Sequence, residues 1–289
     1  MSETALPSLD VRYRECAPLV TDRGIEIYYE TNGDTGPNVV LLNNFYSIAP
    51  MWRTWAPTLS QDYRVTTYDL RNQGATTAGF EAVSWSDHLD DLRDLLDGLG
   101  LDKVYLVGTS TSTLLARDFA IAHPDRVEGV VLQAPSFSPY TSRRRRAVTR
   151  SWLNTLESAG TPALWDQLYS QIFSDQTMAA GGNALYLGLR EIFTSLHSVA
   201  SLLANLTSSL EAADDPDSLS TLVCPTLLII GENDFLWSRS SAEAAAQLIP
   251  DSELLFLPKI GHLLSMEATE AVEQAIRTFI GGLESAKQQ

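Results

Sequence analysis

The chain has 289 residues, of which 44% are hydrophobic, enough for one large domain with an inserted segment. Its formal net charge of −16 argues against a nucleic-acid partner, because an acidic surface is repelled by phosphate. The first residues do not show the basic and then apolar pattern of a secretory leader, so we expect none, and no apolar run reaches the roughly 18–20 residues that span a bilayer. We therefore expect a cytoplasmic protein that does not cross a membrane, with Cys16 and Cys224 as buried, reduced thiols.

The first half of the chain alternates predicted strands and helices at the spacing of βαβ units. Strands are predicted at residues 11–16, 26–30, 38–43, 64–68, 103–107 and 128–132, and helices at residues 51–60, 86–99 and 111–122. The first two strands are expected to pair antiparallel across a turn at residues 22–24. The apolar run of residues 38–43 is typical of a strand that is covered on both faces.

The alternation stops after Ala134-Pro135. The next stretch is predicted to be helical, with helices at residues 145–159, 163–174 and 184–210. The alternation then resumes, with strands at residues 225–230 and 253–257 and helices at residues 242–248 and 267–280. The pattern predicts an α/β fold with a mostly parallel eight-stranded sheet and helices on both faces. We expect residues 1–136 and 218–289 to form its core and residues 137–217 to form a helical cap, or lid.

Three candidate catalytic residues each follow a predicted strand: Ser110 in Gly-Thr-Ser-Thr-Ser, Asp234 in Gly-Glu-Asn-Asp, and His262 in Gly-His. A serine hydroxyl is a weak nucleophile unless an imidazole takes its proton and a carboxylate orients that imidazole. The three residues together therefore predict a catalytic triad. The alternative for Ser110 is an ordinary helix N-terminus, because its neighbours are also serines and threonines that cap helices well.

Other residues compete for two of these roles. Glu232 stands two residues before Asp234 and could supply the carboxylate. Among the other histidines, His88 and His123 are expected to be solvated, whereas His197 lies in the predicted cap and could face a pocket. We favour Asp234 and His262 because each comes just after a late strand.

With these segments in place, the chain resembles the α/β-hydrolase superfamily over residues 10–282. The order Ser, Asp, His and the turn around Ser110 are those of this superfamily, with Ser112 in place of the second glycine of the turn. Residues 69–74 (Asp-Leu-Arg-Asn-Gln-Gly) are similar to its Asp-x-Arg-Gly-x-Gly turn. The resemblance implies that the backbone N–H groups of Phe45 and Thr111 form the oxyanion hole.

The pair Asn43-Asn44 stands where the superfamily has His-Gly. Either the loop has drifted without consequence, or Asn44 turns its amide into the pocket of an enzyme with an unusually polar substrate. We take Asn44, Tyr46 and Trp237 as candidate substrate-binding residues. The Asn-led turn and the segment Gly-His-Leu-Leu-Ser-Met-Glu at residues 261–267 also give a weaker similarity to 3-hydroxyacyl-carrier-protein acyltransferases.

The four arginines at residues 143–146 form a basic cluster in an otherwise acidic chain. They could hold the phosphates of CoA or the acidic surface of an acyl carrier protein, or they are a solvated helix start. The many apolar side chains of the predicted cap favour an apolar acyl group in the pocket.

The leading hypothesis is an ester or thioester hydrolase that acts through an acyl-enzyme. The first alternative is an acyltransferase that passes the acyl group to an alcohol, amine or thiol. The second is a binding or non-hydrolytic use of the fold, since one fold hosts many chemistries. Neither a metal-ligand cluster nor a dinucleotide motif stands out in the sequence, so we expect no metal and no organic cofactor.

Overall fold

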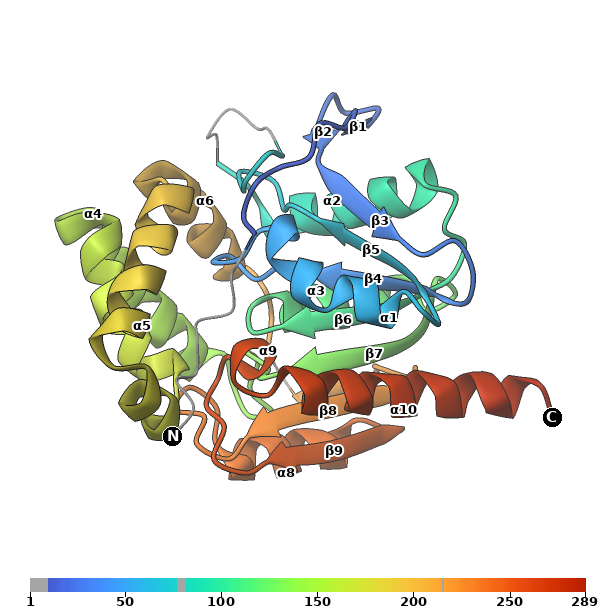
Figure 1. Ribbon diagram of the computed structural model, residues 1–289. Helices are drawn as coiled ribbons and strands as arrows, with labels where there is room; N and C mark the ends of the chain where they lie inside the picture. The colour runs from blue at the N-terminus through green and yellow to red at the C-terminus, as the bar shows by residue number, and fades with distance from the viewer. Residues whose placement is uncertain (1–9, 77–81, 215) are drawn as a thin grey trace.

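The computed structural model describes residues 10–76, 82–214 and 216–289 (Figure 1). Seven of its strands form one sheet in the order β3-β5-β4-β6-β7-β8-β9, while β1 and β2 form a separate antiparallel pair. In the large sheet only β3 and β5 pair antiparallel, and all other neighbours are parallel. The strands are β1 Leu19–Val20, β2 Glu26–Ile27, β3 Tyr29–Asn32, β4 Asn38–Leu42, β5 Arg64–Tyr68, β6 Val104–Thr109, β7 Val127–Gln133, β8 Thr226–Gly231 and β9 Ser252–Leu257. The mostly parallel α/β sheet is confirmed, but it has seven strands where eight were predicted.

The missing strand is the one predicted at residues 11–16, which have no regular secondary structure. Arg14 donates its backbone N–H to the hydroxyl of Tyr28 over 3.1 Å, and the ring of Tyr13 packs edge-on against Tyr28. The hydroxyl of Tyr28 therefore accepts the backbone N–H that Arg14 would donate to a neighbouring strand if this segment were part of the sheet. As a result Cys16 is exposed, contrary to expectation, whereas Cys224 is buried as expected.

Helices cover both faces of the sheet because its strands are apolar on both sides. In β4, Val39 and Leu41 pack in one hydrophobic cluster with residues of α1 and α10, and Val40 and Leu42 pack in another with residues of α2, α3 and α8. This alternation follows from the two-residue period of a strand. The helices of the two faces are η1 Ala49–Thr54 (a 3₁₀ helix), α1 Ala56–Leu59, α2 Trp85–Gly98, α3 Ser112–Ala122, α8 Arg239–Leu248, α9 Leu264–Glu267 and α10 Thr269–Lys287.

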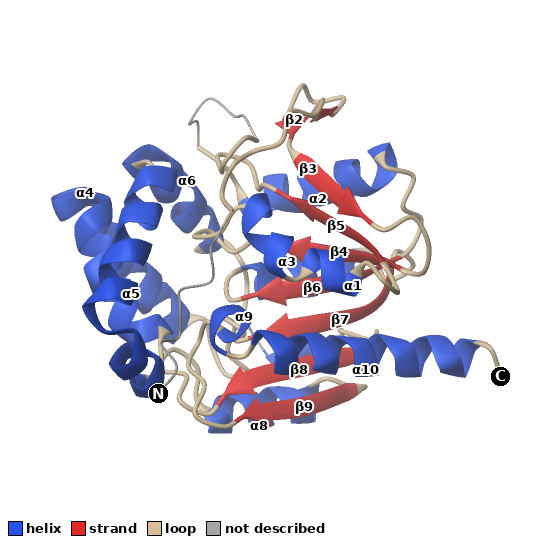
Figure 2. Cartoon of the chain, in the orientation of Figure 1, coloured by secondary structure: helices blue, strands red, loops and turns tan. Residues whose placement is uncertain are grey.

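Between β7 and β8 the chain is helical, as predicted. These helices are α4 Arg143–Ile172, which is kinked at Gly160, α5 Asp175–Leu196, α6 Val199–Ser209 and α7 Pro216–Ser220. Figures 1 and 2 show α4, α5 and α6 gathered beside the end of the sheet where β6 and β7 finish. The single helix predicted at residues 184–210 is wrong, because Ser198 interrupts it and caps α6 by accepting the backbone N–H of Ser201.

One hydrophobic cluster runs without interruption from the sheet into these helices. It contains Leu42 and Leu115 from the sheet side, and Trp152 and Phe193 from α4 and α5. The division into a core and a cap at residues 137 and 217 therefore stays a prediction. Over the described residues, no helix has the length and apolarity that crossing a membrane requires.

Candidate active site

Ser110 occupies a strained turn between β6 and α3. Its φ of +51° lies in the left-handed region that residues other than glycine rarely adopt. A Cβ added to Gly108 would lie 2.7 Å from the carbonyl oxygen of Ser112, so the turn requires glycine there. The hydroxyl of Ser112 accepts the N–H of Thr109 over 2.8 Å and lies 2.9 Å from the carbonyl oxygen of Leu42. Serine thus replaces the second glycine of the turn with a side chain that ties β4 to β6.

The structure brings the three predicted catalytic residues into one hydrogen-bonded chain. The Oγ of Ser110 lies 2.8 Å from Nε2 of His262, and Nδ1 of His262 lies 2.9 Å from Oδ2 of Asp234. The other oxygen of Asp234 accepts the backbone N–H groups of Leu236 and Trp237. Since Asp234 can only accept from Nδ1–H, Nε2 is left free to take a proton from Ser110. The side chains of His262 and Asp234 are almost fully buried, which strengthens both contacts.

The competing carboxylate lies elsewhere. Glu232 pairs with Arg239 over 2.6 Å, and about 40% of its side chain is exposed. It therefore faces solvent and makes no contact with His262.

The remaining histidines do not join the chain. His88 was expected to be solvated, but it is buried and bonds to the hydroxyl of Ser208 over 3.1 Å. His197 is also buried and lies 3.2 Å from the carbonyl oxygen of Tyr46. Burial lowers the pKa of both His88 and His197 to about 4. Both are therefore neutral at pH 7, and His197 can donate to the loop that carries the candidate oxyanion hole.

The residues of the two candidate oxyanion donors are in contact. The backbone N–H of Phe45 donates to Oγ1 of Thr111 over 3.4 Å, a long hydrogen bond that a substrate oxyanion would have to replace, and both residues are buried. A second hydroxyl, that of Ser136, lies 3.4 Å from Oγ of Ser110. Ser136 was not among the site residues predicted from the sequence.

Asn43, which replaces the histidine of the superfamily loop, holds this loop in place. Its amide nitrogen donates to the carbonyl oxygen of Tyr68 over 2.8 Å and lies 3.1 Å from a carboxylate oxygen of Asp69, while its oxygen accepts from the indole of Trp52 over 2.6 Å. Burial raises the pKa of Asp69 to about 6, although the N–H groups that the carboxylate accepts oppose this rise. Asn43 is therefore structural, because both ends of its amide are used inside the protein.

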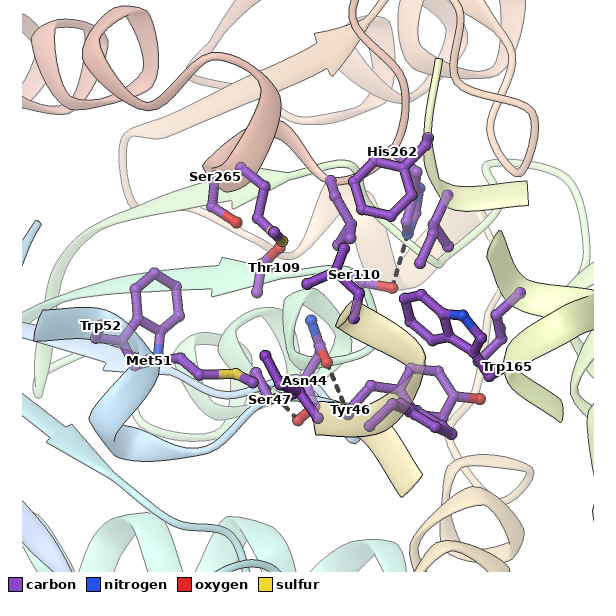
Figure 3. Close-up of a pocket in the computed structure, with 18 of the residues that line it drawn as sticks. Asn44, Tyr46, Ser47, Met51, Trp52, Thr109, Ser110, Trp165, His262 and Ser265 are labelled. Atoms are coloured by element: carbon purple, nitrogen blue, oxygen red, sulfur yellow. Dashed lines mark hydrogen bonds between the residues drawn. The ribbon is translucent and has the colours of Figure 1, made fainter. Parts of the chain in front are cut away.

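A cavity of about 150 Å³ lies against Ser110 and His262 (Figure 3). No lysine, arginine, aspartate or glutamate is among the described residues that line it. Most of its wall is aromatic or aliphatic and comes from the loop after β4, from η1 and from α4 and α5, including Tyr46, Met51, Trp152, Trp165, Leu168 and Phe193. Asn44 and Tyr46, which were predicted to bind substrate, both line this cavity, and their contact with a substrate stays a prediction.

Trp237 lies outside this cavity. It lines a smaller one of about 50 Å³ on the other side of Trp152 and Leu236, and its ring packs edge-on against Phe137. A direct contact of Trp237 with a substrate bound in the main cavity is therefore not supported.

The four arginines at the start of α4 differ in burial and in pairing. Arg145 is buried and pairs with Asp214 over 2.7 Å, and Asp214 also pairs with Arg117 of α3 over 3.0 Å. Arg143 and Arg144 are exposed. Arg145 is therefore committed to joining α4 to the core, and four arginines do not form one free phosphate-binding surface.

Glu267 is a residue of this site that the sequence reasoning did not single out. Its carboxylate accepts hydrogen bonds from the backbone of Ser174 and from the hydroxyl of Thr177, at the junction of α4 and α5. The carbonyl oxygen of Ile172, two residues before Ser174, accepts the backbone N–H of His262 over 3.0 Å. The position of Glu267 five residues after the histidine, as a lone carboxylate at the end of the mostly apolar segment of residues 263–266, was the available clue. Across the described residues, no group of His, Cys, Asp and Glu side chains is placed to hold a metal.

A model of the alpha/beta hydrolase fold family matches residues 37–269. The chain belongs to this family. A solved structure of a thermophilic esterase from Thermogutta terrifontis superimposes with a TM-score of 0.81 at 27% identity, and covers 92% of this chain and 98% of the esterase. These matches extend over nearly the whole described chain, so the α/β-hydrolase fold is shown.

Two curated relatives indicate the range of chemistry in this family. The 3-oxoadipate enol-lactonase 1 of Acinetobacter baylyi is 24% identical over 92% of this chain and 97% of its own length. The human epoxide hydrolase 4 is 24% identical over 92% of this chain and 78% of its own length. Hydrolase relatives of this kind support an enzyme of the hydrolase class that acts on a small molecule, and they leave the bond that is cleaved open.

Proposed function

We propose that this protein is a serine-dependent hydrolase of small to medium-sized, uncharged carboxylic esters, including thioesters and lactones. The observation that carries the proposal is the hydrogen-bonded chain from Ser110 through His262 to Asp234 at the wall of an apolar cavity. The relatives that are named as an esterase and a lactonase support the same reaction class.

In the proposed reaction, Oγ of Ser110 attacks the carbonyl carbon of the ester while its proton passes to Nε2 of His262. The oxyanion that forms is held by the backbone N–H groups of Phe45 and Thr111, each contributing about 3–4 kcal/mol in measured systems. The intermediate expels the alcohol, thiol or ring oxygen, which takes the proton from His262. Water then attacks the acyl-enzyme with His262 as the base, and releases the acid. Asp234 orients the imidazole and stabilises its charged form.

The cavity supports an uncharged substrate. Because none of its described lining residues is lysine or arginine, a carboxylate or phosphate bound there would have no ion-pair partner. This separates the proposal from the enol-lactone of 3-oxoadipate, which is named for the relative and still carries one free carboxylate. With Arg145 paired to Asp214, we do not include CoA or an acyl carrier protein in the proposal.

The test is the release of 4-nitrophenol from 4-nitrophenyl esters, and of thiol from matched thioesters, by the protein and its variants. Ser110→Ala and His262→Gln are each expected to lower kcat by at least about four orders of magnitude, as for other triads. His123→Gln is the control, because His123 is half-exposed at the end of α3 and far from the chain of hydrogen bonds. If Ser110→Ala keeps activity within tenfold of the wild type, the mechanism is wrong. Turnover that is slow in water alone and rises steeply with an added alcohol, with the acylated alcohol as the main product, would make the protein an acyltransferase instead.

A further inference from the structure

Two adjacent asparagines of the loop after β4 use their amides in different ways. Asn43 is fully buried, and both its nitrogen and its oxygen bond to other parts of the protein. Asn44 bonds through its oxygen only, which accepts the backbone N–H of Tyr46 over 2.8 Å. Because a backbone N–H can bond only to the oxygen of an amide, this contact fixes which way the side chain of Asn44 is turned.

The amide nitrogen of Asn44 is left without a protein partner. Among residues 10–76, 82–214 and 216–289, none accepts a hydrogen bond from it, although Asn44 is only 6% exposed. Asn44 lines the cavity beside Ser110, and Figure 3 shows its nitrogen on the side of Ser110 while its oxygen is turned to Tyr46. The unused donor therefore faces the space that a substrate would fill.

A ligand that displaces water from this donor has to supply an acceptor in its place. Once the donor is closed off from water, leaving it unpaired is costly, and buried side-chain groups in native proteins are nearly always hydrogen-bonded. The surrounding wall is mostly aromatic and aliphatic, so it offers little that could accept. Phe45 and Thr111, the candidate oxyanion donors, are not among the residues that line this cavity, whereas Asn44 is. The amide thus faces the body of the substrate.

We propose that the Asn44 amide donates a hydrogen bond to an uncharged oxygen that the substrate carries close to its reacting carbonyl. The distance is set by the chain, because Asn44 directly precedes Phe45, whose N–H is proposed to hold the oxyanion. The preferred substrates are therefore esters or lactones of acids that carry an alkoxy, hydroxy or oxo group on the first or second carbon from the carbonyl. This inference rests on the proposed esterase function and narrows its substrate class.

The experiment compares two substrates of the same length, 4-nitrophenyl butanoate and 4-nitrophenyl methoxyacetate, in which an ether oxygen replaces one methylene. The key variant is Asn44→Ser, because a serine hydroxyl can still accept the N–H of Tyr46 and keep the turn, but it removes the amide donor. The quantity measured is the ratio of kcat/KM for the methoxyacetate to that for the butanoate. Intrinsic reactivity of the two esters cancels when this ratio is compared between wild type and variant.

We expect Asn44→Ser to lower the ratio about tenfold, which is the loss of one hydrogen bond to a neutral acceptor. Asn38→Ser makes the same chemical change at the start of β4, away from the cavity, and is expected to leave the ratio unchanged. An unchanged ratio in Asn44→Ser, including the case of an equal fall in kcat/KM for both esters, would overturn the inference. The amide would then make no hydrogen bond that depends on the ether oxygen of the substrate.

Ser110→Ala, measured with the same two esters, separates the two proposals. If it retains turnover, the proposed function itself fails. If it is inactive and Asn44→Ser leaves the ratio unchanged, the esterase stands and only the substrate class is wrong.

Discussion

Glu267 accepts a hydrogen bond from the backbone N–H of Gly261 over 3.1 Å. The same carboxylate bonds to Ser174 and Thr177, so it links the loop that carries His262 to the junction of α4 and α5. The helices that line the cavity and the candidate catalytic base are thereby held by one side chain. The position of the imidazole depends on how the helices dock.

Replacing Glu267 by Gln should weaken both the fold and the activity. An amide has only one accepting oxygen and would direct its NH₂ group at the donors that the carboxylate now satisfies. We expect the free energy of unfolding to fall by about 1–3 kcal/mol and kcat to fall while KM changes less. Urea unfolding and ester hydrolysis measure the two effects. Glu270→Gln, at an exposed position three residues later, is the matched control and should change neither.

A glycine-to-alanine substitution should reduce activity at Gly108 and increase stability at Gly281. In Gly108→Ala the new Cβ would lie 2.7 Å from the carbonyl oxygen of Ser112, so the turn around Ser110 must shift, and we expect a loss of activity of at least about a hundredfold. In Gly281→Ala, within α10, no atom lies within 4 Å of the new Cβ, and alanine should stabilise the helix by about 0.5–1 kcal/mol. Thermal unfolding and ester hydrolysis of both variants check this. An active Gly108→Ala variant would show that the turn around Ser110 tolerates a larger distance between β6 and α3.

Removing the carboxylate of Asp214 should be strongly destabilising. Arg117 and Arg145 both pair with it, and all three side chains are buried. Asp214→Ala would leave two buried cations short of their shared partner, which costs about 3–5 kcal/mol. Arg144→Ala, next to Arg145 but exposed, should change stability by no more than about 0.5 kcal/mol. Comparable urea midpoints for the two variants would contradict this account.

Stability should fall as the pH drops below about 6.5, in part through His88. Its pKa is about 4 in the folded protein and 6.5 in the reference state, so the unfolded chain binds a proton that the folded protein does not. Stability from this group is therefore present above pH 6.5 and is lost between pH 6.5 and 4, by about 2 kcal/mol at pH 5.

His88→Gln isolates this contribution, since glutamine can still reach the hydroxyl of Ser208 but does not titrate. Between pH 7.5 and pH 5, the free energy of unfolding of the wild type should fall by about 2 kcal/mol more than that of the variant. Asp69, whose raised pKa makes stability fall as the pH rises through about 6, acts in the opposite direction, but it is present in both proteins and cancels. If the difference in unfolding free energy between the two proteins does not depend on pH, His88 takes up its proton as readily in the folded protein as in the unfolded chain.

The order of the elements could be predicted from the sequence because parallel strands covered on both faces are continuous apolar runs. The apolar runs of β4 and β8 are of this kind. A third apolar run, in β6, leads into the turn that carries Ser110. The opening strand at residues 11–16 could not be predicted correctly, because the hydroxyl of Tyr28 takes the backbone donor of Arg14. His88 was judged solvated from its place in a predicted helix, but tertiary contacts with Ser208 of α6 and with the ring of Phe45 are made where it is buried.

By itself, the sequence determined the strand-turn-helix around Ser110 and the positions of Asp234 and His262 after their strands, because these depend on local residue type and order along the chain. The oxyanion candidates came from the resemblance to the α/β-hydrolase superfamily. Their catalytic roles stay predictions until the variants are measured. Only the tertiary structure decided the distances among the three side chains, the pairing of Arg145 with Asp214, and the different uses of Asn43 and Asn44. The reason is physical: the hydrogen bonds and the ion pair that join the three catalytic candidates, Asn43 and Arg145 to their partners span 25 to 152 residues of chain, so they depend on how helices and sheet pack, which no local pattern contains.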